Sequence, residues 1–271
     1  MTDTSIAIAA DDTYLPGLLA CLHGLARHAA GAEVVIMDCG LSESSRRAAR
    51  ETIADKCRIS FQEPRFDIFL LGTERYPAAM YCRLFLSRHA FVNRRVLYLD
   101  ADTIILGSLS ELLRTPLRDH PIAAVRDYHT PTISAQDGLP DWQELGLDAG
   151  LSFFNSGVLL VDLDRWEREK YEHAAVQHAR RYQAVSCNDQ HALNAAFAGR
   201  WHELPPVWNT TRFWFKAERR THAYANILSE ARIVHFIGPH KPWKPDPDIP
   251  EAQLDRFFRA LDGTALAGWR P

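Results

Sequence analysis

The sequence has no apolar run of the roughly 18 residues that a membrane-spanning helix requires. Its first residues, MTDTS, lack the basic region of a secretory signal peptide, and the apolar stretch 5–10 is too short to be the hydrophobic region of one. These absences predict that the chain carries neither a transmembrane segment nor a cleaved leader. Peripheral contact with an inner membrane is left open.

Cysteine is sparse, with five residues that are odd in number, scattered, and never in a CxxC pair. This pattern excludes a disulfide framework and a thiolate zinc site. It favours free thiols in a reducing compartment, so we expect a cytoplasmic protein. The cysteines are Cys21, Cys39, Cys57, Cys82 and Cys187.

Positive charge is not in excess, because the formal net charge is −3. The chain therefore lacks the overall basic field that recruits nucleic acid, and any anionic ligand must be held by local cations. There is also no internal repeat, low-complexity tract or clear linker in the 271 residues. We expect a single domain over residues 1–271.

Apolar strand-like runs alternate with segments of helical spacing through the first hundred residues. This rhythm is typical of βαβ units and predicts an α/β fold with a largely parallel sheet flanked by helices. Strands are expected at residues 5–10, 33–38, 58–61, 96–99, 121–126 and 232–236, an apolar run at 153–162, and helices at 15–29, 42–55, 78–89, 163–184 and 189–198. Two irregular segments, 64–77 and 128–150, are expected to shape the entry of a ligand.

The segment 96–102 reads VLYLDAD and stops abruptly at two carboxylates. Residues i and i+2 of an extended chain point the same way, so Asp100 and Asp102 converge beyond the carboxyl end of a strand. Two such charges repel unless a cation lies between them or one is protonated. The pair predicts a divalent metal site, although carboxylates also end strands for purely structural reasons.

His235 follows a third apolar run and precedes the segment FIGPHKPW. In that segment Gly238 permits close backbone approach to a ligand, and Lys241 supplies a point charge for phosphate. Two carboxylates and one imidazole would leave open positions for diphosphate oxygens on Mn²⁺, with Mg²⁺ as the second choice. A hydrogen-bonded structural histidine is the alternative.

Two short polar groups precede apolar segments. Residues 154–157 read FNSG, where Asn155 and Ser156 could meet a sugar hydroxyl or could simply form a turn. Residues 188–190 read NDQ, where Asp189 and Gln190 could face a transferred sugar, or Asn188 or Asp189 could cap a helix.

Taken together, these motifs resemble glycosyltransferase family 8, the family of bacterial lipopolysaccharide α-galactosyl- and α-glucosyltransferases and, more distantly, of glycogenin. The resemblance runs from Ser5 to about Trp243, and six motifs in the family's order make chance an unlikely explanation. They are residues 9–12 (AADD), 81–84 (YCRL), 97–102 (LYLDAD), 154–160 (FNSGVLL), 188–190 (NDQ) and 235–243 (HFIGPHKPW).

The resemblance implies a GT-A fold with a smaller acceptor-side part. It also implies a UDP-sugar donor (UDP-galactose or UDP-glucose), Mn²⁺, a glycan or other hydroxyl acceptor, and transfer with retention to give an α-linkage. Metal ligands would be Asp100, Asp102 and His235, and the catalytic pair would be Asp189 and Gln190. Donor-binding residues would be Ala9, Asp11, Tyr14, Arg83, Asp100, Asp127, Asn155, Ser156, Gly238 and Lys241.

The sequence departs from the family pattern at two positions that directly follow these motifs. Thr13 stands where relatives tend to have Asn, and its hydroxyl can still make one hydrogen bond. His191 stands where an Asp is common, so a covalent double displacement through this position is not expected. The shorter end of the chain, without a basic aromatic tail, leaves membrane association open.

Three other functions share parts of this pattern. A haloacid dehalogenase-type phosphohydrolase could use Asp100 and Asp102, but it would carry them after its first strand and would have Thr or Val at the position of Ile104. A sugar nucleotidyltransferase would need a glycine-rich basic loop where residues 11–14 are acidic. A non-catalytic nucleotide-sugar-binding protein would keep the ligands without turnover.

Overall fold

A computed structural model gives the fold of the chain. It describes residues 3–66, 78–185, 187–211, 227–245 and 248–271. Most of the irregular segment expected at 64–77 lies outside these ranges.

A seven-stranded sheet with the order β3-β2-β1-β4-β7-β6-β8 organises the fold. The first four strands in this order run parallel, β7 is antiparallel to both of its neighbours, and β8 is parallel to β6. The prediction of an α/β fold with a mostly parallel sheet is confirmed. The strands are β1 (Thr4–Ala10), β2 (Glu33–Asp38), β3 (Arg58–Gln62), β4 (Arg95–Asp100), β6 (Ile122–Arg126), β7 (Phe154–Asp162) and β8 (Trp201–Leu204).

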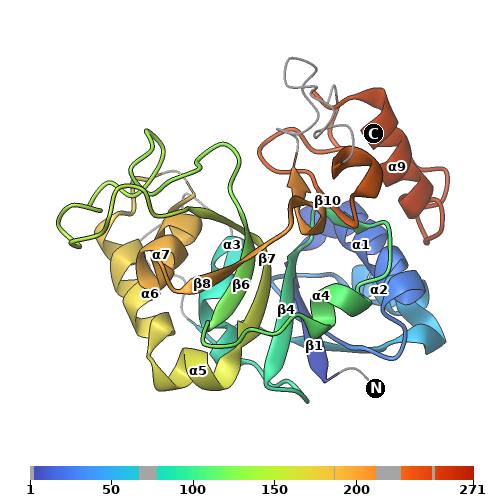
Figure 1. Cartoon of the computed structure of the whole chain (residues 1–271). Helices are drawn as coiled ribbons and strands as arrows, with labels where there is room; N and C mark the ends of the chain where they lie inside the picture. The colour runs from blue at the N-terminus through green and yellow to red at the C-terminus, as the bar shows by residue number, and fades with distance from the viewer. Residues whose placement is uncertain (1–2, 67–77, 186, 212–226, 246–247) are drawn as a thin grey trace.

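Helices cover both faces of this sheet (Figure 1). Strand β1 shows why, because Ile6 and Ile8 join one hydrophobic cluster with α1 while Ala7 and Ala9 join a second cluster on the other face. Strands buried on both faces need continuous apolar sequence, which β1 and β4 have. The α-helices are α1 (Leu15–His28), α2 (Glu43–Ile53), α3 (Ala78–Tyr81), α4 (Ser110–Arg114), α5 (Leu163–Arg168), α6 (Tyr171–Arg181), α7 (Asn188–Phe197) and α9 (Glu251–Leu261).

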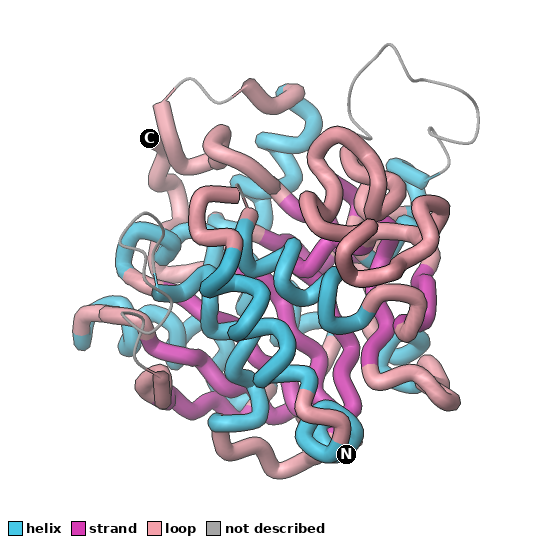
Figure 2. The backbone as a smooth tube through the Cα atoms, turned by 90° about the vertical axis from the view of Figure 1, so that its left-hand side faces the viewer, coloured by secondary structure: helices cyan, strands magenta, loops and turns pink. Residues whose placement is uncertain are grey.

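The strands lie behind a layer of helices when the molecule is seen from the side, and loops gather at the end of the sheet away from the N-terminus (Figure 2). At that end a second sheet forms from β5 (Thr103–Ile105), β10 (Ile233–His235) and β9 (Thr210–Thr211). Strand β10 pairs antiparallel with β5, which places His235 opposite Thr103. The small sheet thus brings a distant segment beside the end of β4.

Two helix predictions were wrong in detail. The helix expected at 163–184 is divided, because Lys170 between α5 and α6 has a left-handed φ of 58°. The helix expected at 78–89 is one turn of α-helix followed by a 3-10 segment, Cys82–Arg88, in which Phe85 leaves helical geometry. Strands β5, β8 and β9 and helices α4 and α9 were not predicted.

All five cysteines are free, as the sequence predicts. Within the ranges described, no helix combines the length and the apolar character needed to cross a membrane.

Candidate active site

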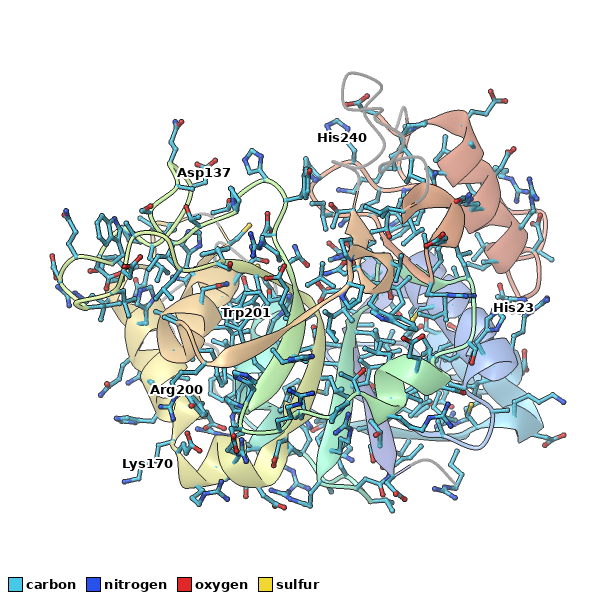
Figure 3. All side chains as sticks on the ribbon, viewed as in Figure 1. His23, Asp137, Lys170, Arg200, Trp201 and His240 are labelled. Carbon is cyan, nitrogen blue, oxygen red and sulfur yellow. The ribbon has the colours of Figure 1, made fainter. Side chains whose placement is uncertain are left out.

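A cavity of about 940 Å³ opens at the carboxyl ends of β1 and β4. Figure 3 shows its surroundings, with Asp137 on the loop of residues 128–150 and His240 on the segment after β10 at the two sides of this end. The sequence-predicted site residues that line it are Ala9, Tyr14, Arg83, Asp100, Asp102, Asp127, Asn155, Ser156, Asp189, Gln190, His235, Gly238 and Lys241.

Asp100, Asp102 and His235 meet in this cavity, and one ligand atom from each lies within 4.8 Å of the others. The His235 Nε2 is 3.1 Å from Asp102 Oδ1 and 3.5 Å from Asp100 Oδ2. Asp100 is the last residue of β4, and Asp102 lies in the turn between β4 and β5. Strand β5 then pairs with the strand of His235, which places His235 opposite Thr103, the residue after Asp102. Strand pairing therefore creates the three-ligand group that the sequence predicts.

Gly157 leaves the space in which this group forms. A Cβ atom at this position of β7 would lie 2.7 Å from Asp100 Oδ2 and would overlap the ring of His235. Contacts of a real Cβ atom are seldom closer than 3.4 Å. A side chain at position 157 is thus incompatible with the observed arrangement of the two ligands.

Lys241 lies against Asp102 and donates to its Oδ2 and, at 2.8 Å, to the carbonyl oxygen of Phe236. Burial alone would raise the pKa of Asp102, but Lys241 and His235 reverse the effect and hold it well below its usual range. Burial would lower the pKa of Lys241, but the negative charge of Asp102 outweighs this effect, so the pKa of Lys241 is raised. The site therefore keeps both a buried carboxylate and a buried ammonium group charged.

Arg83 joins the metal-ligand group to the predicted sugar side. Its Nη2 is 2.6 Å from Asp100 Oδ1, and its Nε is 3.1 Å from Asp189 Oδ2. Tyr98 donates to the same Asp100 oxygen at 2.8 Å. Burial raises the pKa of Asp189, although Arg83 opposes the shift. One guanidinium thus balances two carboxylates that reach the cavity from different elements.

Gln190 and Ser156 form a second polar group beside Arg83. The backbone N–H of Ser156 donates to Gln190 Oε1 at 3.0 Å, and Arg83 Nη1 donates to the Ser156 hydroxyl at 2.8 Å. Gln190 Nε2 donates in turn to Asp127 Oδ2 at 3.1 Å. These bonds fix the orientation of the Gln190 amide.

The alternative that Asn188 or Asp189 caps the helix is wrong. The residue before α7 is Cys187, in left-handed geometry with a φ of 52°, and no side chain caps the helix. The Asn188 amide instead reaches back to the carbonyls of Ala179 and Tyr182. Asp189 instead lines the cavity, where it pairs with Arg83.

The acidic pair at the end of β1 does not face the cavity as a unit. Asp11 accepts from Thr13 and Tyr14 and so caps a short 3-10 helix, Asp12–Tyr14, without lining the cavity. Asp12 accepts from Ser42 at the start of α2. Only Ala9, paired with Asp100 across β1 and β4, and Tyr14 reach the site.

Sequence reasoning missed one buried residue beside the ligands. Asn209 is 1% exposed, and its Oδ1 accepts from His235 Nδ1 at 3.0 Å. It also missed how the loop 128–150 is held, since His191 Nε2 lies 3.0 Å from the carbonyl oxygen of Gly138. Neither residue has a local signal, because both act through contacts distant in sequence.

The model of a family described as Glycosyl transferase family 8 matches residues 5–246. The chain belongs to glycosyltransferase family 8. The resemblance found in the sequence motifs is confirmed.

Relatives within glycosyltransferase family 8 are moderately similar. General stress protein A of Bacillus subtilis is 26% identical over 180 residues, which are 63% of this chain and 59% of that protein. Lipopolysaccharide 1,2-glucosyltransferase of Escherichia coli is 32% identical over 177 residues, 63% of this chain and 51% of that one. The chain thus matches little more than half the length of these relatives.

Solved structures confirm the GT-A fold. Galactosyltransferase LgtC, crystallised with donor and acceptor sugar analogues, superposes with a TM-score of 0.75 at 25% identity, over 96% of each chain. The bifunctional glycosyltransferase WbbM gives a TM-score of 0.76 at 20% identity, over 97% of this chain and 50% of that one, and this likeness concerns the fold alone.

Proposed function

We propose that this enzyme transfers a hexose, galactose or glucose, from a UDP-sugar to an acceptor hydroxyl with retention of the anomeric configuration. The observation that carries the proposal is the convergence of Asp100, Asp102 and His235 in a cavity that also holds Lys241 and Arg83. A cluster of cations and metal-ligating groups suits a nucleoside diphosphate better than a neutral ligand.

The three ligands fit a divalent cation. Two carboxylates and one imidazole are hard and borderline donors that suit Mn²⁺, with Mg²⁺ as the alternative. Gly157 adds independent support, because only a residue without a side chain leaves room for Asp100 and His235 to lie as close together as they do. When bound, the metal would supply positive charge to the diphosphate of the donor.

The proposed donor lies across the cavity from base to sugar. Ala9 and Tyr14, which line the cavity, hold the base, and Asp100 also contacts the ribose. Asp11 does not line the cavity and supports the base site indirectly, by accepting the backbone N–H of Tyr14. Gly238 and Lys241 hold the diphosphate, where the Lys241 ammonium, kept charged by Asp102, neutralises the leaving group. The residues proposed to surround the hexose are Arg83, Asp127, Asn155, Ser156, Asp189 and Gln190.

Asp189 and Gln190 are proposed as the catalytic pair. The buried Asp189 carboxylate stabilises positive charge that develops at the anomeric carbon, and the Gln190 carbonyl oxygen contributes a neutral dipole. His191 at the next position offers no carboxylate nucleophile, and it is engaged with backbone carbonyls. Attack of the acceptor hydroxyl on the face that the diphosphate leaves is therefore the preferred route. The bond from the anomeric carbon to the phosphate oxygen breaks as the new bond to the acceptor oxygen forms, and the departing phosphate oxygen takes the hydroxyl proton.

The lipopolysaccharide glycosyltransferases among the relatives support a glycan as acceptor, and a lipopolysaccharide core is our first candidate. The free cysteines support a cytoplasmic location, with contact at the inner membrane left as a second possibility.

The experiment that tests the function is a screen of nucleotide sugars with Mn²⁺, read by NMR of the released or transferred sugar. We expect turnover of UDP-galactose or UDP-glucose, an α-configured first product, and loss of turnover with chelator and in Asp102→Ala. A non-catalytic protein would bind UDP with Mn²⁺ but give no turnover. Release of phosphate from an aryl phosphate, abolished in Asp100→Asn, would favour the phosphohydrolase and overturn the proposal.

A further inference from the structure

A row of hydrogen bonds connects Asp127 to His235 through two buried amides. Asn155 Nδ2 donates to Asp127 Oδ2 at 3.1 Å, and Asn209 Nδ2 donates to Asn155 Oδ1 at 2.8 Å. His235 Nδ1 completes the row at 3.0 Å from Asn209 Oδ1. All four residues are at most 6% exposed. We call these four residues the amide relay.

The relay has a fixed direction because it begins at a carboxylate. A carboxylate only accepts hydrogen bonds, and Asp127 Oδ1 accepts from the backbone N–H groups of His129 and Thr130. Its Oδ2 accepts from Asn155 and from Gln190. The Asn155 amide must therefore turn its NH₂ group toward Asp127.

This orientation determines each later step. With its NH₂ group committed to Asp127, Asn155 presents Oδ1 on the other side, where it accepts from Asn209 and also from the backbone N–H of Gly157. Asn209 must then present its own NH₂ group to Asn155 and its Oδ1 to His235. The imidazole can bond to this oxygen only if Nδ1 carries a proton.

The relay favours a proton on Nδ1 of His235, whereas the carboxylate of Asp102 beside the ring favours a proton on Nε2. The His235 Nε2 lies 3.1 Å from Asp102 Oδ1, so in the absence of Asn209 a proton on Nε2 would gain a charge-assisted hydrogen bond. A protonated Nε2 cannot ligate a metal. The residue that keeps Nδ1 protonated therefore decides whether Nε2 offers a lone pair to the metal site.

We propose that Asn209 is a positioning residue that holds His235 in its Nδ1–H tautomer and so prepares Nε2 as a metal ligand. The inference rests on the proposed metal-dependent function and adds a residue to it. It also couples the two halves of the site, because the same Asp127 oxygen orients both the amide relay and Gln190. The metal side and the sugar side are thus aligned by one carboxylate.

The direct test is ¹⁵N NMR of His235 in metal-free protein, at a pH at which its ring is neutral. We expect the Nδ1–H tautomer in the wild type and a shift toward Nε2–H in Asn209→Leu. Asn209→Asp retains an acceptor for Nδ1–H but loses the donor to Asn155 Oδ1, so it should keep the wild-type tautomer at a cost in stability. Asn194→Leu is the matched control, because Asn194 is equally buried and bonded to Phe154 and Gln190 but has no bond to the relay.

The second readout is Mn²⁺ affinity in the presence of UDP, measured by calorimetry. Asn209→Leu should bind Mn²⁺ roughly 10- to 100-fold more weakly, the usual effect of losing a partner of a histidine ligand. Asn209→Asp should recover most of that affinity, whereas a purely structural role would weaken both variants alike.

The two proposals fail in different ways. A wild-type His235 with Nε2–H, or an unchanged tautomer in Asn209→Leu, would overturn the role of Asn209 whatever the activity. If Asn209→Leu does not fold, the wild-type and Asn209→Asp spectra still decide. Unchanged Mn²⁺ affinity in Asp102→Ala would instead overturn the metal site itself.

Discussion

Gly157→Ala adds one methyl group at the point where β7 passes the proposed metal ligands. Gly157 does not have a left-handed φ, so alanine can adopt its backbone conformation. In an ordinary strand this exchange would stabilise the fold by about 0.5–1 kcal/mol, because glycine loses more entropy on folding. Here the new Cβ would lie 2.7 Å from Asp100 Oδ2 and would overlap the imidazole of His235. Gly157→Ala is therefore expected to lower the free energy of unfolding instead of raising it.

The magnitude follows from how the neighbours must move. Overpacking by one methyl group in a close-packed site costs about 1–3 kcal/mol of unfolding free energy. The imidazole cannot turn away freely, because its Nδ1 is bonded to Asn209, and the loss of that bond costs about 1 kcal/mol more. A displaced His235 no longer meets Asp100 and Asp102, so Mn²⁺ affinity should fall roughly 10- to 100-fold.

The assay pairs urea denaturation with Mn²⁺ titration in the presence of UDP. Gly150→Ala is the matched control, since a Cβ there would meet only Asp148 Oδ1, at 3.2 Å, on an exposed side chain. That variant should stay within about 0.5 kcal/mol of the wild type. If Gly157→Ala were as stable as the control and bound Mn²⁺ normally, the tight packing of position 157 against Asp100 and His235 would be refuted.

Two further predictions concern buried titratable groups. Asp189→Asn should lower kcat roughly 100-fold or more while UDP affinity stays within about twofold, as measured by kinetics and calorimetry, and near-normal kcat would remove Asp189 from catalysis. Because burial raises the pKa of Asp189 above the ordinary 3.8, its carboxylate is lost earlier as the pH falls, so the acid limb of the kcat profile should lie above that value in the wild type. His89 is 4% exposed, no described residue bonds to its ring, and burial lowers its pKa to about 4. The unfolded chain takes up a proton below a pH of about 6.5 while the folded protein does not, so stability that is complete above that pH should fall by roughly 3 kcal/mol toward pH 4. Urea unfolding at several pH values should show a flatter profile in His89→Leu but not in His173→Leu, an exposed control, and equal slopes in all three proteins would contradict the assignment.

The sequence by itself determined most strands of the large sheet and the residue types of the metal-ligand group. Continuous apolar runs define β1, β2 and β4, because parallel strands are buried on both faces. The paired carboxylates Asp100 and Asp102 were predicted to converge as i and i+2 of one strand, but β4 ends at Asp100 and Asp102 lies in the turn before β5. The two groups do meet, and the turn rather than strand alternation brings them together. The family motifs extended this reading to the fold and to sugar transfer.

Sequence patterns failed where a left-handed residue or a long-range contact decided the outcome. The break between α5 and α6 occurs at Lys170, an ordinary helix former whose φ of 58° no local pattern announces. The acidic pair Asp11 and Asp12 diverges, because each caps or bonds a different neighbouring turn. Hydrogen bonds thus direct two side chains that are adjacent in the sequence to different neighbours.

Only the tertiary structure decided how the site closes. His235 reaches Asp102 because β10 pairs with β5, and Arg83 lies between Asp100 and Asp189 because three separate elements pack around it. Asn209 has no motif, and its importance exists only in the direction of its hydrogen bonds. Periodicity records which side of a strand is buried, whereas the pairing of distant strands determines which buried groups meet.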